Sequence, residues 1–164
     1  MNYTKGQYVI YSGTEICSIG EIVKRNFDGE GEKDYITINP LELNTTFYVP
    51  WDKADYALKP LMPKEKLLEL IERMKTETAQ SRGNTESRNI NFRDALKEGN
   101  HEVILSVMSE IYMEKLNRAE SGKQLYKMDK RNFELAKKLI DCEISILFGI
   151  ESSEVEAFIR SKVK

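Results

Sequence analysis

The chain has 164 residues, of which 40% are hydrophobic and 32% charged, and its formal net charge is -2. This balance is typical of one ordinary globular domain or two small ones and argues against an intrinsically disordered chain. The charge is unevenly spread, because residues 1–60 hold six Lys/Arg against nine Asp/Glu, whereas residues 61–164 hold nineteen against eighteen.

The first sixty residues predict a small β module. Short runs rich in β-branched and aromatic residues alternate with turn residues such as Gly13 and the 28–32 segment, which is typical of strands joined by tight turns. Four or five strands fit, and the clearest runs are Tyr8–Tyr11, Ile16–Lys24, Tyr35–Ile38 and Thr46–Val49. We expect an SH3-like or Tudor-like barrel over residues 1–60.

From residue 61 the hydrophobic spacing changes to that of helices, so we expect an α+β protein whose second domain, residues 61–164, holds about five helices. Pro63 suits a first helical turn, and Gly83 predicts a loop or hinge after the first helix. Two further helices are expected over Glu86–Glu98 and Glu102–Ala119.

The last two helices are predicted from their caps. Asp129 is a good N-cap for a fourth helix, which should end at Gly149. Ser153 and Glu156 have the spacing of a capping box and predict a short final helix.

Enzymatic signals are nearly absent. His101 is the only histidine, and a lone imidazole at a helix start is more often structural than catalytic. The sequence lacks paired metal-ligand motifs, a phosphate-binding glycine loop and a nucleophile elbow. We therefore expect no enzyme, no cofactor, no metal and no small-molecule substrate, although a hydrolase that uses surface carboxylates stays open as a minor alternative.

Cellular location follows from what the chain lacks. Two cysteines, Cys17 and Cys142, are too few for a secreted disulfide framework, so we expect reduced, buried thiols. The N-terminus lacks the features of a signal peptide, and the longest apolar run, residues 144–150, is far shorter than the roughly 20 residues that span a bilayer. We expect a cytoplasmic protein that does not contact membranes.

Two stretches suggest binding. Between Lys115 and Lys138 lie eight basic residues against three acidic ones, which fits either contact with nucleic-acid phosphates or a solvated helix face. In the β module, Thr45–Trp51 combines aromatics with a proline. This fits an edge strand that captures a partner by strand addition, or aromatics such as Phe47 and Trp51 that complete a small core.

Taken together, the motifs resemble the CarD family of bacterial transcription regulators, whose N-terminal module is shared with transcription-repair coupling factors. The resemblance rests on four segments in order along nearly the whole chain: Lys5–Tyr11, Phe47–Tyr56, Leu96–Asn100 and Leu125–Arg131. It implies a Tudor-like module that binds the RNA polymerase β subunit. It also implies a helical domain that contacts promoter DNA at the upstream edge of the transcription bubble and modulates open-complex stability.

The resemblance implies polymerase contacts at Arg25 and Tyr48, the latter standing where the family often has an arginine. With the predicted edge strand, the expected polymerase-binding residues are Arg25, Phe47, Tyr48, Val49 and Pro50. The resemblance likewise implies DNA contacts at Arg88, Lys130 and Arg131. With the basic stretch, the expected DNA-binding residues are Arg88, Lys123, Lys127, Lys130 and Arg131, mostly for backbone contacts.

One departure from the family concerns the bubble edge. Many members have a tryptophan there that wedges into the minor groove, whereas residues 84–88 of this chain contain no aromatic and Thr85 stands in that stretch. Without a wedge, DNA binding should be weak and sensitive to salt. The alternative is an adaptor that binds polymerase through protein contacts alone, with little or no DNA contact.

Overall fold

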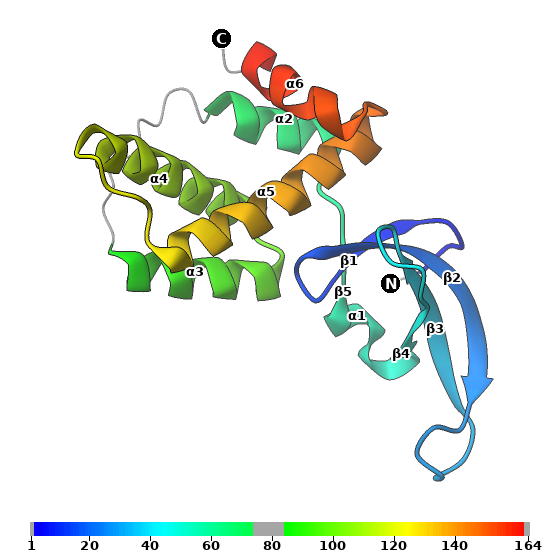
Figure 1. The fold of residues 1–164 in the computed structure, drawn as a ribbon. Helices are drawn as coiled ribbons and strands as arrows, with labels where there is room; N and C mark the ends of the chain where they lie inside the picture. Colours follow the sequence, from blue (N-terminus) through cyan, green and yellow to red (C-terminus); the bar gives the residue numbers. More distant parts are fainter. Residues whose placement is uncertain (1, 74–83, 163–164) are drawn as a thin grey trace. The chain divides into compact units, whose positions relative to one another are not determined.

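The computed structural model describes residues 2–73 and 84–162. The chain divides into two compact units, Met1–Leu61 and Met62–Lys164. The first is built from strands and the second from helices, and the α+β fold class predicted from the sequence is confirmed (Figure 1).

The N-terminal unit is a five-stranded antiparallel sheet with a Tudor-like fold. Its strands lie in the order β4-β3-β2-β1-β5, so β4 and β5 form the two edges. The strands are β1 (Tyr8–Tyr11), β2 (Glu15–Arg25), β3 (Lys33–Pro40), β4 (Phe47–Pro50) and β5 (Leu58–Pro60). A 3-10 turn, η1 (Trp51–Lys53), and a short helix, α1 (Ala54–Ala57), connect β4 to β5.

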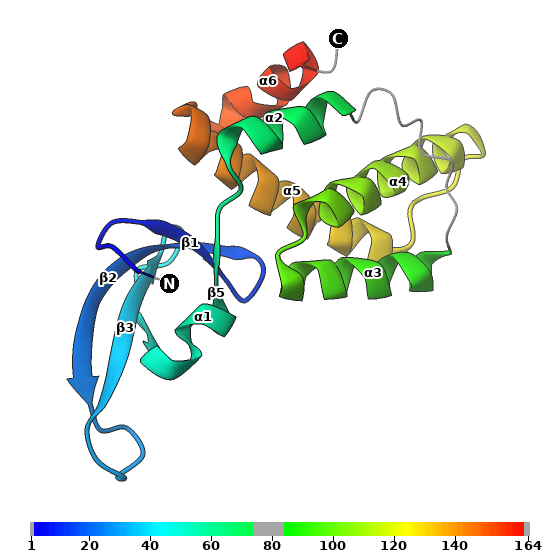
Figure 2. The same cartoon turned by 180° about the vertical axis from the view of Figure 1, so that it is seen from behind.

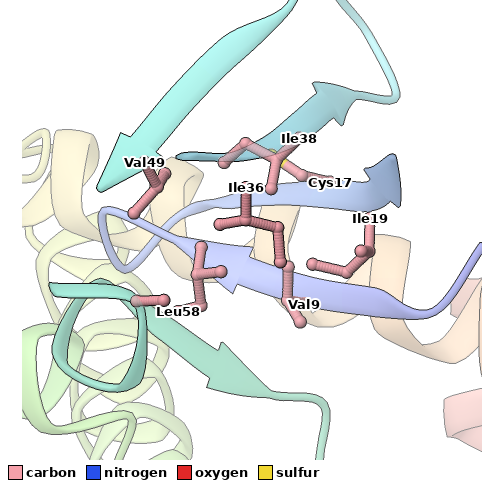
Figure 3. Close-up of a cluster of buried hydrophobic side chains, with 8 residues drawn as sticks. Val9, Cys17, Ile19, Ile36, Ile38, Val49 and Leu58 are labelled. Atoms are coloured by element: carbon pink, nitrogen blue, oxygen red, sulfur yellow. The ribbon is translucent and has the colours of Figure 1, made fainter. Parts of the chain in front are cut away.

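The core of this unit comes from one face of the sheet. Side chains alternate between the two faces of a strand, so Ile36 and Ile38 of β3 point to the same side and are fully buried. They pack with Val9 of β1, Val49 of β4 and Leu58 of β5 (Figure 3). Cys17 also lies in this core, and burial, followed by the charge of Glu15, raises the pKa of its thiol to about 11. Cys17 is buried as expected, whereas Cys142 is only partly buried.

Sequence patterns did not identify η1, α1 or the fifth strand. Each has only three or four residues, too few to show a period, and β5 ends in a proline. Its pairing with β1, from Leu58 opposite Tyr11 to Pro60 opposite Val9, is nonlocal in sequence. Tertiary packing therefore places this strand, since Leu58 fills the core.

The C-terminal unit holds five α-helices and one 3-10 turn within the described residues. They are α2 (Lys64–Arg73), α3 (Thr85–Glu98), α4 (His101–Glu120), α5 (Lys127–Phe148), η2 (Ser152–Glu154) and α6 (Val155–Lys162). Helices α3, α4 and α5 pack against one another, and α2 packs with α4 and α6 (Figure 2). A second core joins Leu67 of α2, Leu105 of α4, Ile140 and Ile144 of α5, and Val155 of α6.

Two predicted caps were wrong. Tyr126, in an extended conformation, is the N-cap of α5, and Asp129 instead lies buried in the first turn. The capping box is formed by Glu151 and Glu154, at the start of the 3-10 turn before α6, where each side chain accepts a hydrogen bond from the other residue's backbone N–H. The predicted break at Gly83 lies outside the described residues.

His101 is buried and structural, as expected. Its Nε2 lies 2.6 Å from Oε2 of Glu143, and its Nδ1 lies 3.1 Å from the carbonyl oxygen of Gly99. The other oxygen of Glu143 accepts a hydrogen bond from the backbone N–H of Met62 at 2.9 Å. Burial alone would lower the pKa of His101, but the hydrogen bond and charge of Glu143 outweigh it, so the pKa lies above 6.5.

A raised histidine pKa makes the stability of the chain depend on pH. Because folded His101 holds its proton more tightly than the unfolded side chain, its contribution is complete below about pH 6.5 and is lost as pH rises through the folded pKa. Urea titrations from pH 6 to 8.5 should show the free energy of unfolding falling by up to about 1.4 kcal/mol per pH unit. Glu143→Gln should flatten this slope, and an equally steep slope in that variant would contradict the assignment.

Candidate interaction surfaces

Strand β4 is an open edge of the sheet. Within the described part of the N-terminal unit it pairs with β3 alone, through Ile38 opposite Phe47 to Tyr35 opposite Pro50. The outer side of an edge strand presents backbone N–H and C=O groups that another chain can pair with. The geometry therefore suits partner capture by strand addition.

The side chains of β4 divide into two sets. Val49 is 3% exposed and belongs to the core, and half-buried Phe47 packs on Tyr11 with ring centroids 5.6 Å apart. Tyr48 and Pro50 point to the opposite face, where Tyr48 is 41% exposed. Of the predicted polymerase-binding residues on this strand, Val49 is thus unsuited to a side-chain contact.

Phe27, which was not among the predicted binding residues, joins Tyr48 on this outer face. Its ring lies 5.0 Å from that of Tyr35 and 5.3 Å from that of Tyr48, both edge-to-face, and it is 60% exposed. We call Phe27, Tyr35 and Tyr48 the aromatic patch. Phe27 was missed because it lies in a polar turn segment, where its single signal is an aromatic residue among glycines and acids.

Arg25 lies on the same face as the aromatic patch. The register pairs Val23 with Tyr35 and Arg25 with Lys33, and residues two apart on a strand point to one side. Among the described residues no carboxylate pairs with Arg25, whose guanidinium donates to the carbonyl of Lys24 at 2.9 Å. The structure therefore brings Arg25 and Tyr48, far apart in sequence, to one face of the sheet.

A bulge in β2 fixes the direction of this part of the strand. The pairing of β2 with β3 shifts between Ile19 and Ile22. There Oγ of Thr37 accepts from the backbone N–H of Glu21 at 2.7 Å and donates to its carbonyl at 3.0 Å. A Cβ at Gly20 would lie 2.3 Å from that hydroxyl, so only glycine fits. Such bulges bend a strand and increase its twist, and this one positions Arg25.

In the helical unit Arg88 has a structural position. Its side chain is 4% exposed, and its Nη2 and Nε lie 2.7 and 3.2 Å from the two carboxylate oxygens of Asp129. This bidentate ion pair joins α3 to α5. The structure does not support the prediction that Arg88 contacts DNA, because its guanidinium is turned to Asp129 and covered.

Thr85 belongs to the same polar cluster. Its hydroxyl donates to Oδ2 of Asp129 at 3.1 Å. Thr85 lies in the 84–88 stretch, which contains no aromatic, and its hydroxyl helps to satisfy a buried carboxylate.

A groove in the helical unit gathers part of the basic stretch. Its volume is about 450 Å³, and it is bordered by the end of α4, the following loop and the start of α5. Four lysines line it: Lys115, Lys123, Lys130 and Lys137. The remaining lining includes Ala119, Leu125, Phe133 and Glu134. We call it the lysine groove. Of the predicted DNA-binding residues, Lys123 and Lys130 line it, whereas Lys127 and Arg131 are exposed on α5 outside it.

Arg118 holds the loop that carries Lys123. Its Nε donates to the carbonyl of Gln124 at 2.6 Å, and its guanidinium lies 4.1 Å from the ring centroid of Tyr126. The backbone N–H of Lys123 in turn donates to the carbonyl of Arg118 at 2.8 Å. Arg118 is thus committed to local structure, and Lys123 is held in place beside the groove.

Residues 2–73 and 84–162 contain no group of three or more His, Cys, Asp or Glu side chains placed to hold a metal ion. None of the helices described is both long and apolar enough to cross a membrane.

A small Tudor-like sheet with an open edge, an exposed aromatic patch and an unpaired arginine defines a protein-interaction module. Residues 3–62 match the family described as the CarD-like/TRCF RID domain, which is an interaction domain without catalytic function. Residues 3–62 are therefore a CarD-like module of the kind shared with transcription-repair coupling factors, and this match supports a transcription-related protein that interacts with RNA polymerase. The match ends before the helical unit. Comparison with curated proteins gives no match.

The position of Arg88 gives a test of its role. Arg88→Met should lower the free energy of unfolding by about 3–5 kcal/mol, because Asp129 is left charged and buried without an ion-pair partner. Adding Asp129→Leu should recover much of the loss. The control Arg93→Met, exposed on the same helix, should change stability by less than about 0.5 kcal/mol. Normal stability of Arg88→Met in urea titrations, with weaker DNA binding, would restore the DNA assignment.

Proposed function

We propose that the protein regulates transcription by binding the β subunit of RNA polymerase through its N-terminal unit and promoter DNA through its helical unit, near the upstream edge of the bubble. The observation that carries the proposal is the joint placement of the aromatic patch and Arg25 beside the open edge of β4. The family match over this unit supports the same partner.

The two parts of this surface supply different components of binding. Backbone pairing along β4 gives register and affinity, and exposed aromatic and arginine side chains are the residue types that dominate interface energies. Phe27 is already held against Tyr35 and Tyr48, so little side-chain freedom is lost when a partner covers it. This favours a polymerase grip centred on Phe27 and Tyr48.

The helical unit supplies phosphate contacts. Among the described residues, no carboxylate pairs with Lys123, Lys127, Lys130 or Arg131, so these cations can replace the counterions of a DNA backbone. No aromatic stands at the position of the family's wedge. DNA contact of this kind modulates open-complex stability by charge rather than by prying a base step apart.

The alternative is an adaptor with protein contacts alone. The burial of Arg88 favours it, because it removes one of the five cations that the sequence assigned to DNA. In either form the protein acts in the cytoplasm by contact, with no chemical step and no cofactor.

The polymerase surface is tested with the isolated β-subunit lobe and the full chain. Phe27→Ala and Tyr48→Ala should each weaken binding roughly 30-fold, as expected for an interface hot spot of about 2 kcal/mol, and Arg25→Glu should weaken it too. The control Tyr56→Ala removes an aromatic that is 82% exposed elsewhere in the unit and should leave the Kd unchanged. Undiminished binding of all three surface variants in calorimetry would rule out this surface.

The DNA contact is tested by the salt dependence of binding to a polymerase–promoter complex. Lys130→Gln with Arg131→Gln removes two cations and should reduce the slope of log K against log salt by about 1.8. The matched control, Arg93→Gln with Lys97→Gln, removes two exposed cations of α3 and should keep the slope. Equal slopes for wild type and the α5 variant would favour the protein-only adaptor.

A further inference from the structure

The lysine groove combines two unlike surfaces. Lys130, Phe133 and Lys137 recur at helical spacing on α5, so charged and aromatic side chains alternate along one face of the helix. Leu125 adds apolar surface from the preceding loop. A volume of about 450 Å³ lies within the roughly 300–1,000 Å³ of ligand pockets.

The charge of the lining is strongly positive. Four lysines face the groove against one carboxylate, Glu134. Among the described residues Lys115, Lys123 and Lys130 have no ion-pair partner, and only Lys137 is paired, with Asp141. The occupant must therefore be anionic, yet it must also cover Leu125 and the ring of Phe133.

The phosphates of a duplex would meet the requirement for negative charge. Its bases would not cover the apolar surface, because they are stacked and paired inside the helix. A single strand offers phosphates and flat base faces in alternation, and a basic groove with an aromatic is the usual arrangement for binding one. An acidic peptide could match the charge, but only rarely would its spacing supply a flat apolar group beside each anion.

We propose that the lysine groove binds an unpaired nucleotide, with its base against Phe133 and Leu125 and its phosphates at Lys115, Lys123 and Lys130. The inference rests on the proposed function, which brings this unit to melted promoter DNA. Capture of a base that has already left the stack stabilises the opened strand without a side chain wedged between base pairs.

The test uses the full chain and three fluorescently labelled probes in anisotropy titrations at fixed salt. They are a short oligothymidylate, an abasic strand of the same length and charge, and a duplex. The oligothymidylate should bind about tenfold more tightly than the abasic strand, as expected for stacking of a base on an aromatic side chain.

Three variants separate stacking from charge. Phe133→Ala should bring the affinities for the two single strands together, and Leu125→Ser, a loop change that spares the helix, should reduce their ratio in the same direction. Lys115→Gln should weaken both single strands equally. The control Lys97→Gln, exposed on α3, should change neither.

Equal binding of the oligothymidylate and the abasic strand by wild type would overturn the inference, as would displacement of the oligothymidylate by polyglutamate at equal charge concentration. Failure of the proposed function is seen separately. If the duplex binds with a salt slope that depends on Lys130 and Arg131 while the single-strand preference is missing, only the nucleotide groove is wrong. If no DNA binds while the β-subunit lobe still does, the DNA role falls with it.

Discussion

Two buried carboxylates on one helix set the geometry of the helical unit. Asp129, in the first turn of α5, pairs with Arg88 of α3, and Glu143, in its last third, pairs with His101 at the start of α4. A buried charge without its partner is strongly destabilising, so α3 and α4 can each pack on α5 in one register only. Both Asp129 and Glu143 are fully buried, and Glu143 also holds the backbone of Met62. The lysine groove, between the end of α4 and the start of α5, follows from that fixed packing.

The N-terminal unit depends on a steric constraint at residue 20, where the backbone lies too close to Thr37 for any side chain to fit. Gly20 lies under the hydroxyl of Thr37, which bonds both backbone groups of Glu21 across a shift in the sheet register. Without the bulge, side chains would alternate between the two faces of the sheet without interruption along β2. Arg25 would then point to the core face rather than to the face of Tyr35. A single glycine thus decides which side of the sheet carries the arginine.

Period and turn chemistry predicted the elements well wherever they were long. The runs at β1 to β4 and the helices from residue 86 onward were found because their hydrophobic spacing persists over several residues, and the Tudor-like fold of the N-terminal unit was confirmed. The prediction for Asp129 was wrong because an aspartate is favourable at a helix start both as the N-cap and in the first turn. Which of the two positions it takes depends on its ion pair with Arg88, 41 residues away in sequence. Phe27 could not be predicted as a binding residue, because its place in the aromatic patch depends on its ring contact with Tyr48, which is distant in sequence.

The absence of an aromatic side chain at residue 85 and the buried ion pair of Arg88 are linked, because Thr85 and Arg88 both contact Asp129. Thr85 is small enough for its hydroxyl to reach Asp129, and a large aromatic there would forfeit that hydrogen bond. Asp129 keeps its place because it pairs with Arg88, and its position in the first turn of α5 turns the adjacent Lys130 outward to the groove. The hydrogen bond from Thr85 to Asp129 therefore disfavours an aromatic at residue 85, and the burial of Asp129 leaves the adjacent Lys130 facing the groove. In the proposed function, affinity for opened DNA depends on charge and on a side chain in the groove, rather than on a ring inserted between base pairs.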